Sequence, residues 1–300
     1  MAGRLILPEH FVELERLEMN REVGVGLTGV GTLLMAFSAG GFMLLGQAMG
    51  SLSPDRISWT AWLLGFLLTF PLHEALHGLV ARAYGARPRY GAGMAGPLPY
   101  FYCAPEWSFR RNQHLLVLLT PLVVLDLLAL GALGVPALAP IGFTVQVLNT
   151  SGAVGDLWMA FRVSRYPLEL IVVEEGMVSR LMGEPGWRRP AGRVESWWPD
   201  LGFGATWSFL GLILAPSLLW IPLDLLFGER GFYLEVLPLP GLHFWTIYSG
   251  PDGAGSMVDF NGALPWWLLF TLAFGAIRRR KRLRQRRAGQ ENVAASRIEP

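Results

Sequence analysis

The chain has 300 residues, of which 52% are hydrophobic and only 16% are charged. Soluble domains contain about 25% charged residues, so this composition argues against an ordinary soluble protein and favours a membrane protein with several spans. The formal net charge of +2 excludes little. The single cysteine excludes an intrachain disulfide and a zinc site built from several cysteines.

The predicted elements begin with a leader, residues 1–22, in which residues 8–21 form either a short amphipathic helix or a frayed segment. Long uncharged stretches then predict about six transmembrane helices. A small cytoplasmic β-hairpin is predicted where residues 168–173 and 177–182 flank a Glu-Glu-Gly turn. The expected fold is therefore an all-α polytopic membrane protein with one hairpin. The predicted spans are residues 23–54, 57–80, 115–138, 141–161, 201–227 and 260–277.

These spans divide the chain into five parts. After the leader come a membrane core of four spans (23–163), a cytoplasmic loop with the hairpin (164–200), two further spans with an external loop at 228–258 (201–277), and a basic cytoplasmic tail (278–300). The tail is expected to be disordered and to bind anionic lipids. The roles of the last two spans and of the external loop stay open.

Arginine alternates between sparse and dense across the segments outside the spans. The first six segments contain three, one, five, zero, six and one arginine, and the tail opens with a basic cluster. By the positive-inside rule, this pattern predicts that both termini are cytoplasmic. Lysine occurs once among 25 basic residues, which suggests a GC-rich bacterial genome. The expected location is the bacterial plasma (inner) membrane, with the lipid bilayer as a partner.

An HExxH motif, His73-Glu74-Ala75-Leu76-His77, lies within the second predicted span. On a helix, the two histidines at i and i+4 share one face, so both can reach one metal ion. Glu74 is then placed to take a proton from a water molecule at that metal. Ionisable groups at membrane depth are costly and usually mark function. The motif therefore predicts a Zn²⁺ site.

Depth in the membrane favours Asp156 as the third ligand; the alternative is a buried carboxylate that pairs with an arginine or caps a helix break at Gly152 or Gly155. At 1.5 Å per residue, the two histidines lie about 10 Å and Asp156 about 9 Å from the cytoplasmic side. Asp126 is too deep, at about 22 Å, and is expected to serve structure or water access. His114, at about 5 Å, is a reserve candidate. Asp224 approaches the opposite face.

Three further features stay open at this point. Asn149, two turns before Asp156, either orients a ligand or substrate, or makes an interhelical hydrogen bond. Ser151 is a weaker candidate for the same supporting role. Residues 90–103 either offer an edge strand to an unwound substrate or form an ordinary cytoplasmic loop.

Three motifs together resemble those of membrane zincin peptidases, a family related to intramembrane metalloproteases of the site-2 protease type. They are His73-Glu74-x-x-His77, Tyr102-Cys103-Ala104-Pro105, and the run Asn149-Thr150-Ser151-Gly152-Ala153-Val154-Gly155-Asp156. The resemblance covers roughly residues 57–182. The chain departs from the site-2 pattern because Leu157, not glycine, follows Asp156, and because it has no obvious PDZ domain.

The resemblance implies an intramembrane zinc endopeptidase whose substrate is a membrane protein or peptide, and no nucleic-acid partner is expected. The alternatives are an inactive pseudoprotease that binds partners, or a metal-ion transporter. The complete set of four motif residues argues against the first alternative. Transporters usually show repeats and a long polar path, whereas here the polar groups cluster at one depth. The substrate, cleavage site, trigger and oligomeric state do not follow from the sequence.

Overall fold

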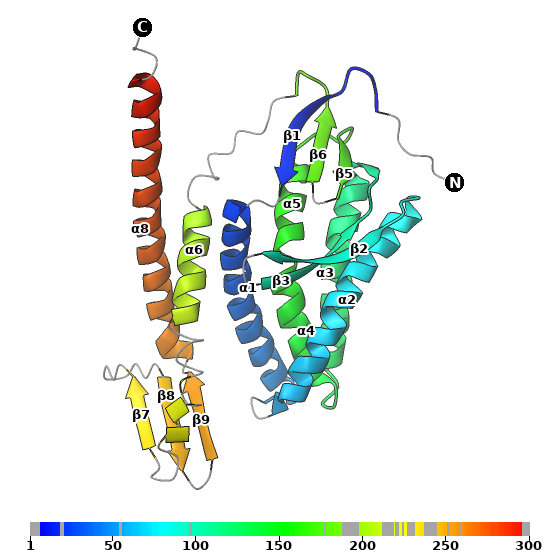
Figure 1. Ribbon diagram of the computed structural model, residues 1–300. Coiled ribbons are helices and arrows are strands. Elements are labelled where there is room, and N and C mark those ends of the chain that lie inside the picture. The colour runs from blue at the N-terminus through cyan, green and yellow to red at the C-terminus, as the bar shows by residue number, and fades with distance from the viewer. Residues whose placement is uncertain are drawn as a thin grey trace. The chain divides into compact units, whose positions relative to one another are not determined.

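A computed structural model defines the fold (Figure 1) and divides the chain into two compact units, Met1–Arg193 and Val194–Pro300, which are described separately. The described residues are 7–18, 21–53, 56–95, 98–176, 178–187, 198–211, 219, 222–223, 225–226, 232–236, 245–250, 253–258 and 260–295.

Long apolar helices dominate the first unit. They are α1 (Arg21–Ala48), α2 (Trp59–Ala83), α3 (Arg111–Leu133), α4 (Ala139–Gly152) and α5 (Val154–Ser164). In the part of the chain that the structure describes, three helices are long and apolar enough to cross a membrane: Val23–Ala48, Thr60–Ala83 and Arg111–Leu133. Large apolar side chains such as Leu67 and Leu128 point outward from them, exposed by 56% and 65%. Such surfaces are suited to lipid, and they indicate a membrane protein.

The prediction of six spans is not supported. The expected fourth span, 141–161, is broken at Ala153 into α4 and α5, which have 14 and 11 residues. A straight helix needs about 20 residues to cross the bilayer. Of the expected fifth span, α6 (Trp198–Phe209) is described, but residues 212–218, 220–221, 224 and 227 lie outside the described residues. The expected sixth span is the first half of α8 (Phe260–Ala295), which continues as a helix through most of the predicted disordered tail.

A four-stranded antiparallel sheet accompanies these helices, in the order β1-β6-β5-β4. The predicted hairpin is confirmed as β5 (Ile171–Glu175) and β6 (Val178–Gly183). Gly176 takes a φ of +66° at the turn, a conformation that glycine adopts without strain. The expectation of a lone hairpin was incomplete, because β4 (Ser108–Arg110) and β1 (Val12–Glu18) extend the sheet on either side.

Strand β1 corrects the predicted amphipathic helix at residues 8–21. It pairs with β6 and inserts Leu17 into a core that includes Tyr166, Leu170 and Leu181. The buried Glu15 carboxylate accepts hydrogen bonds from Arg162 and from the Tyr166 hydroxyl. The leader is therefore part of the folded unit, attached to α5.

A second hairpin, β2 (Arg89–Ala95) and β3 (Leu98–Ala104), follows α2 and packs against it. A Cβ atom added at Gly78 of α2 would lie 1.9 Å from the Tyr90 hydroxyl, so a glycine permits this close approach. The rings of Phe70 and Phe101 lie 5.9 Å apart between their centroids. Residues 90–95 and 98–103, for which the sequence left two alternatives open, form the paired strands of this hairpin.

The second unit pairs α6 with α8. Gly204 of α6 lies against the backbone of Thr271, and the Ser208 and Thr271 hydroxyls are 2.9 Å apart. The predicted external loop contains a three-stranded antiparallel sheet of β7 (Phe232–Val236), β8 (Trp245–Gly250) and β9 (Gly253–Val258). The expectation of an all-α fold is thus corrected to a mostly helical protein with β-sheets.

Candidate metal centre

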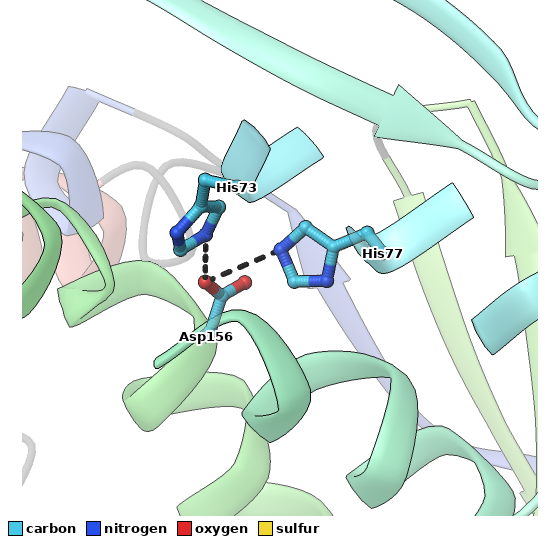
Figure 2. A group of neighbouring side chains, drawn as sticks. All are labelled: His73, His77 and Asp156. Carbon is cyan, nitrogen blue, oxygen red and sulfur yellow. Dashed lines mark hydrogen bonds and ion pairs between the residues drawn. The ribbon is translucent and has the colours of Figure 1, made fainter. Parts of the chain in front are cut away.

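The two histidines of HExxH and one carboxylate converge where α2 meets α5. His73 and His77 project from α2 toward Asp156, as Figure 2 shows. The Asp156 Oδ2 atom lies 3.0 Å from His73 Nε2 and 3.5 Å from His77 Nε2. Both histidines are only 8% exposed. The structure therefore brings together the three residues expected to bind zinc.

The break at Ala153 positions Asp156. Helix α4 ends at Gly152 and the Ala153 N–H donates to the Asn149 carbonyl, after which α5 begins at Val154. Asp156 consequently lies in the first turn of α5. Unpaired N–H groups give a helix N-terminus partial positive charge, which favours a carboxylate there. The interruption of the predicted fourth span is thus part of how the site is built.

Asn149 fixes the orientation of His73. Its Oδ1 atom lies 2.8 Å from His73 Nδ1, and its Nδ2 donates to Asp126 Oδ1 at 2.7 Å. The same Nδ2 faces the backbone carbonyls of Pro121 and Leu122, which only accept hydrogen bonds. This settles which end of the amide faces the imidazole, so His73 Nδ1 carries the proton.

His77 is held in the same tautomer by a backbone group. Its Nδ1 atom donates to the Val117 carbonyl of α3 at 2.7 Å. A carbonyl oxygen only accepts, so this nitrogen also carries the proton. In the neutral rings, both Nε2 atoms then present lone pairs to Asp156.

This donor set fits a zinc ion. Two nitrogen lone pairs and a carboxylate oxygen that face one another repel unless a cation lies among them. Bond lengths of 2.0–2.1 Å in tetrahedral zinc sites place ligand atoms about 3.3 Å apart, and the two distances above bracket this value. His₂-carboxylate sets that leave one position open are typical of catalytic zinc.

Glu74 lies beside this group. The two histidines and Asp156 act on its carboxylate electrostatically, and the backbone of Cys103 in β3 contributes a hydrogen bond to it. Burial, followed by the Glu74 charge, raises the pKa of the half-buried Cys103 thiol to about 12. The thiol next to the site is therefore neutral at physiological pH.

The other candidates lie elsewhere. His114 is 2% exposed and pairs with Glu174 at 2.7 Å, outside the group of three, so it is not brought to the site. The Ser151 hydroxyl donates to the Val147 and Leu148 carbonyls of its own helix. Asp126 accepts from Asn149 and Thr150, and Asp224 lies outside the described residues.

Sequence reasoning missed the Val117 carbonyl, since a backbone group leaves no side-chain signature. A signal was nevertheless present. Pro121 stands four residues after Val117 and cannot supply the helical N–H that this carbonyl would normally receive.

One comparison with known proteins, a family match, covers this part of the chain. A Pyrococcus woesei protein described as "Uncharacterized 24.7 kDa protein in gap 5'region" is 27% identical to the chain over 143 residues. The aligned part is 46% of this chain and 64% of that protein, so the chain spans less than two thirds of that relative's length. No solved structure matches the chain significantly. Residues 66–171, which include His73, His77 and Asp156, match a family described as "Putative zincin peptidase"; this match supports a zincin-like family and suggests a zinc metallopeptidase.

Proposed function

We propose that this chain is an intramembrane zinc endopeptidase of the site-2 protease type. His73, His77 and Asp156 hold the ion. The observation that carries this proposal is the convergence of their three ligand atoms, all within 4.8 Å of one another, beside the Glu74 carboxylate. The apolar outer surfaces of α2 and α3 support a substrate that is itself in the membrane.

Glu74 is the proposed general base. Zinc, when bound, is a Lewis acid that makes water more acidic and polarises a carbonyl group. The Glu74 carboxylate takes one proton from the attacking water as its oxygen bonds to the scissile carbon. Glu74 then delivers that proton to the nitrogen that leaves as the C–N bond breaks. The acceptor-only partners of both histidines keep their Nε2 atoms free for the metal.

The β2–β3 hairpin is the proposed contact for the substrate backbone. A transmembrane substrate must first unwind, because the carbonyls of a helix are occupied by their i+4 N–H groups. An unwound segment can pair with a strand edge. The hairpin approaches α2 through Tyr90 and Phe101 and contributes the Cys103 hydrogen bond to Glu74. These contacts support its role as a strand edge beside the reacting groups.

We also propose that both termini face the cytoplasm of a bacterial plasma (inner) membrane. The arginine distribution around the three candidate spans supports this orientation of the N-terminus: three arginines precede residue 23, one lies between residues 48 and 60, and five lie in residues 82–111. The basic second half of α8 supports the same side for the C-terminus. Arg279, Arg280 and Lys281 are exposed on α8, directly after its apolar half. They are the proposed binding surface for anionic lipid headgroups.

The replacement Glu74→Gln tests the reaction. The parent chain in lipid vesicles should cleave a single-span reporter protein whose helix contains a Gly-Pro pair, with new termini identified by mass spectrometry. Glu74→Gln should lower the rate about 10²- to 10⁴-fold and keep one zinc per chain. The control Glu169→Gln, at an exposed position, should leave both unchanged. Cleavage by Glu74→Gln at the parental rate would contradict the mechanism, and zinc flux without cleavage would favour a transporter instead.

A further inference from the structure

Pro121 interrupts the hydrogen-bond ladder of α3 at one carbonyl. In an α-helix the N–H of residue i donates to the carbonyl of residue i−4. Proline has no N–H, and its ring presses against the carbonyl at i−4. In α3 that carbonyl belongs to Val117. The N–H that would normally donate to it, that of residue 121, is therefore missing.

His77 supplies the missing donor. Its Nδ1 lies 2.7 Å from the Val117 oxygen, and His77, Val117 and Pro121 are all buried. A buried carbonyl without a hydrogen-bond donor costs free energy, and so does a buried imidazole N–H without an acceptor. One hydrogen bond between α2 and α3 satisfies both groups.

We infer that Pro121 is a positioning residue for the proposed zinc site, and this inference rests on the proposed function. By leaving the Val117 carbonyl free, Pro121 fixes both the tautomer and the plane of the His77 ring. The ring then directs Nε2 toward Asp156. Groups that orient a metal-binding histidine in this way typically change metal affinity 10- to 100-fold when they are removed.

Two substitutions at position 121 separate the missing N–H from the other properties of proline. Pro121→Ala restores an N–H that competes with His77 for the Val117 carbonyl. Lactic acid at position 121, introduced by nonsense suppression, has the methyl group of alanine but an ester oxygen in place of the N–H. Pro265→Ala is the matched control, because Pro265 also lies inside a helix, α8, in the other unit of the chain.

The readouts are zinc affinity, measured by competition with a fluorescent chelator at constant pH, and thermal unfolding of the zinc-free protein. Pro121→Ala should weaken zinc binding about 10-fold or more, while the zinc-free protein melts at an equal or higher temperature because alanine favours a helix. The lactic-acid variant and Pro265→Ala should bind zinc as the parent does.

The outcomes distinguish a failure of this inference from a failure of the proposed zinc peptidase function on which it rests. A parent chain that binds no zinc overturns the proposed function and the inference together. A parent that binds zinc, with Pro121→Ala equally tight, overturns the inference alone. Equal losses in the alanine and lactic-acid variants also overturn it, since the free carbonyl would then not be the cause.

Discussion

Replacing Asn149 with leucine removes both hydrogen bonds that connect His73 to Asp126. Asn149 is 1% exposed, so water cannot replace the lost amide. A buried polar group without its partner costs about 1–3 kcal/mol. Because the His73 N–H and the Asp126 carboxylate both lose a partner, the free energy of unfolding should fall by about 2–6 kcal/mol. Zinc affinity should fall about 10- to 100-fold, because His73 is no longer held in one tautomer.

Exchanging the side chains at positions 126 and 149 provides a sharper test than removing one of them. Asn149→Asp keeps an acceptor for His73 but sets two carboxylates against each other, and it should also weaken binding. The double variant Asn149→Asp with Asp126→Asn restores one donor facing one acceptor and should recover most of the affinity. Ser151→Ala is the control, because the Ser151 hydroxyl donates to carbonyls of its own helix.

Zinc competition and thermal unfolding measure these effects, and a double-mutant cycle yields the coupling between positions 126 and 149. Coupling between residues in one hydrogen-bond network is typically about 0.5–3 kcal/mol. Asn149→Leu with parental zinc affinity would refute the orienting role. A double variant no better than the Asn149→Asp variant would show that Asp126 does not act through the amide.

Three further predictions concern the surroundings of the site and the second unit. In the folded chain, the pKa of about 12 lowers the thiolate fraction of Cys103 at pH 8 by about three orders of magnitude relative to an exposed cysteine. Iodoacetamide, which reacts with the thiolate, should therefore modify the native chain far more slowly than the urea-unfolded chain. Glu74→Gln should accelerate this reaction by removing a negative charge, and equal rates in native and unfolded chains would contradict the burial. Glu15→Ala removes one partner of a buried ion pair with Arg162 and should lower the unfolding free energy of the first unit by about 3–5 kcal/mol; a chemical-denaturation midpoint close to the parent's would argue against it. Gly204→Ala places a Cβ 2.1 Å from the Thr271 carbonyl oxygen and should destabilise the second unit by about 1–3 kcal/mol. Gly211→Ala, whose Cβ would meet none of the described residues within 4 Å, should not.

The histidine pair and its carboxylate were within reach of sequence reasoning. Helical periodicity predicts that His73 and His77 share a face, and a rise of 1.5 Å per residue is enough to prefer Asp156 over Asp126 by depth. The run from 141 to 161 was expected to form one span, and a break at Gly152 or Gly155 was only the alternative. Gly152, Gly155 and Asp156 lie among its apolar residues, but glycine is tolerated inside membrane helices, so the composition does not show that α4 ends at Gly152.

Strand β1 could not be predicted from the sequence for a different reason. Its partners lie 160 or more residues away, with Arg16 opposite Arg180 and Leu17 opposite Ser179. A register shift between Glu13 and Glu15 interrupts the alternation that would mark a strand. The spacing of Phe11, Leu14 and Leu17 therefore fits a helix in the sequence, although pairing with β6 decides the fold.

Zinc K-edge X-ray absorption on the purified chain tests the central claim most directly. The account predicts one zinc per chain, bound at about 2.0–2.1 Å by two imidazole nitrogens together with oxygen ligands, and loss of the stoichiometric metal in Asp156→Ala. A sulfur ligand at about 2.3 Å, which only Cys103 or a methionine could supply, or an unchanged spectrum in Asp156→Ala, would contradict it.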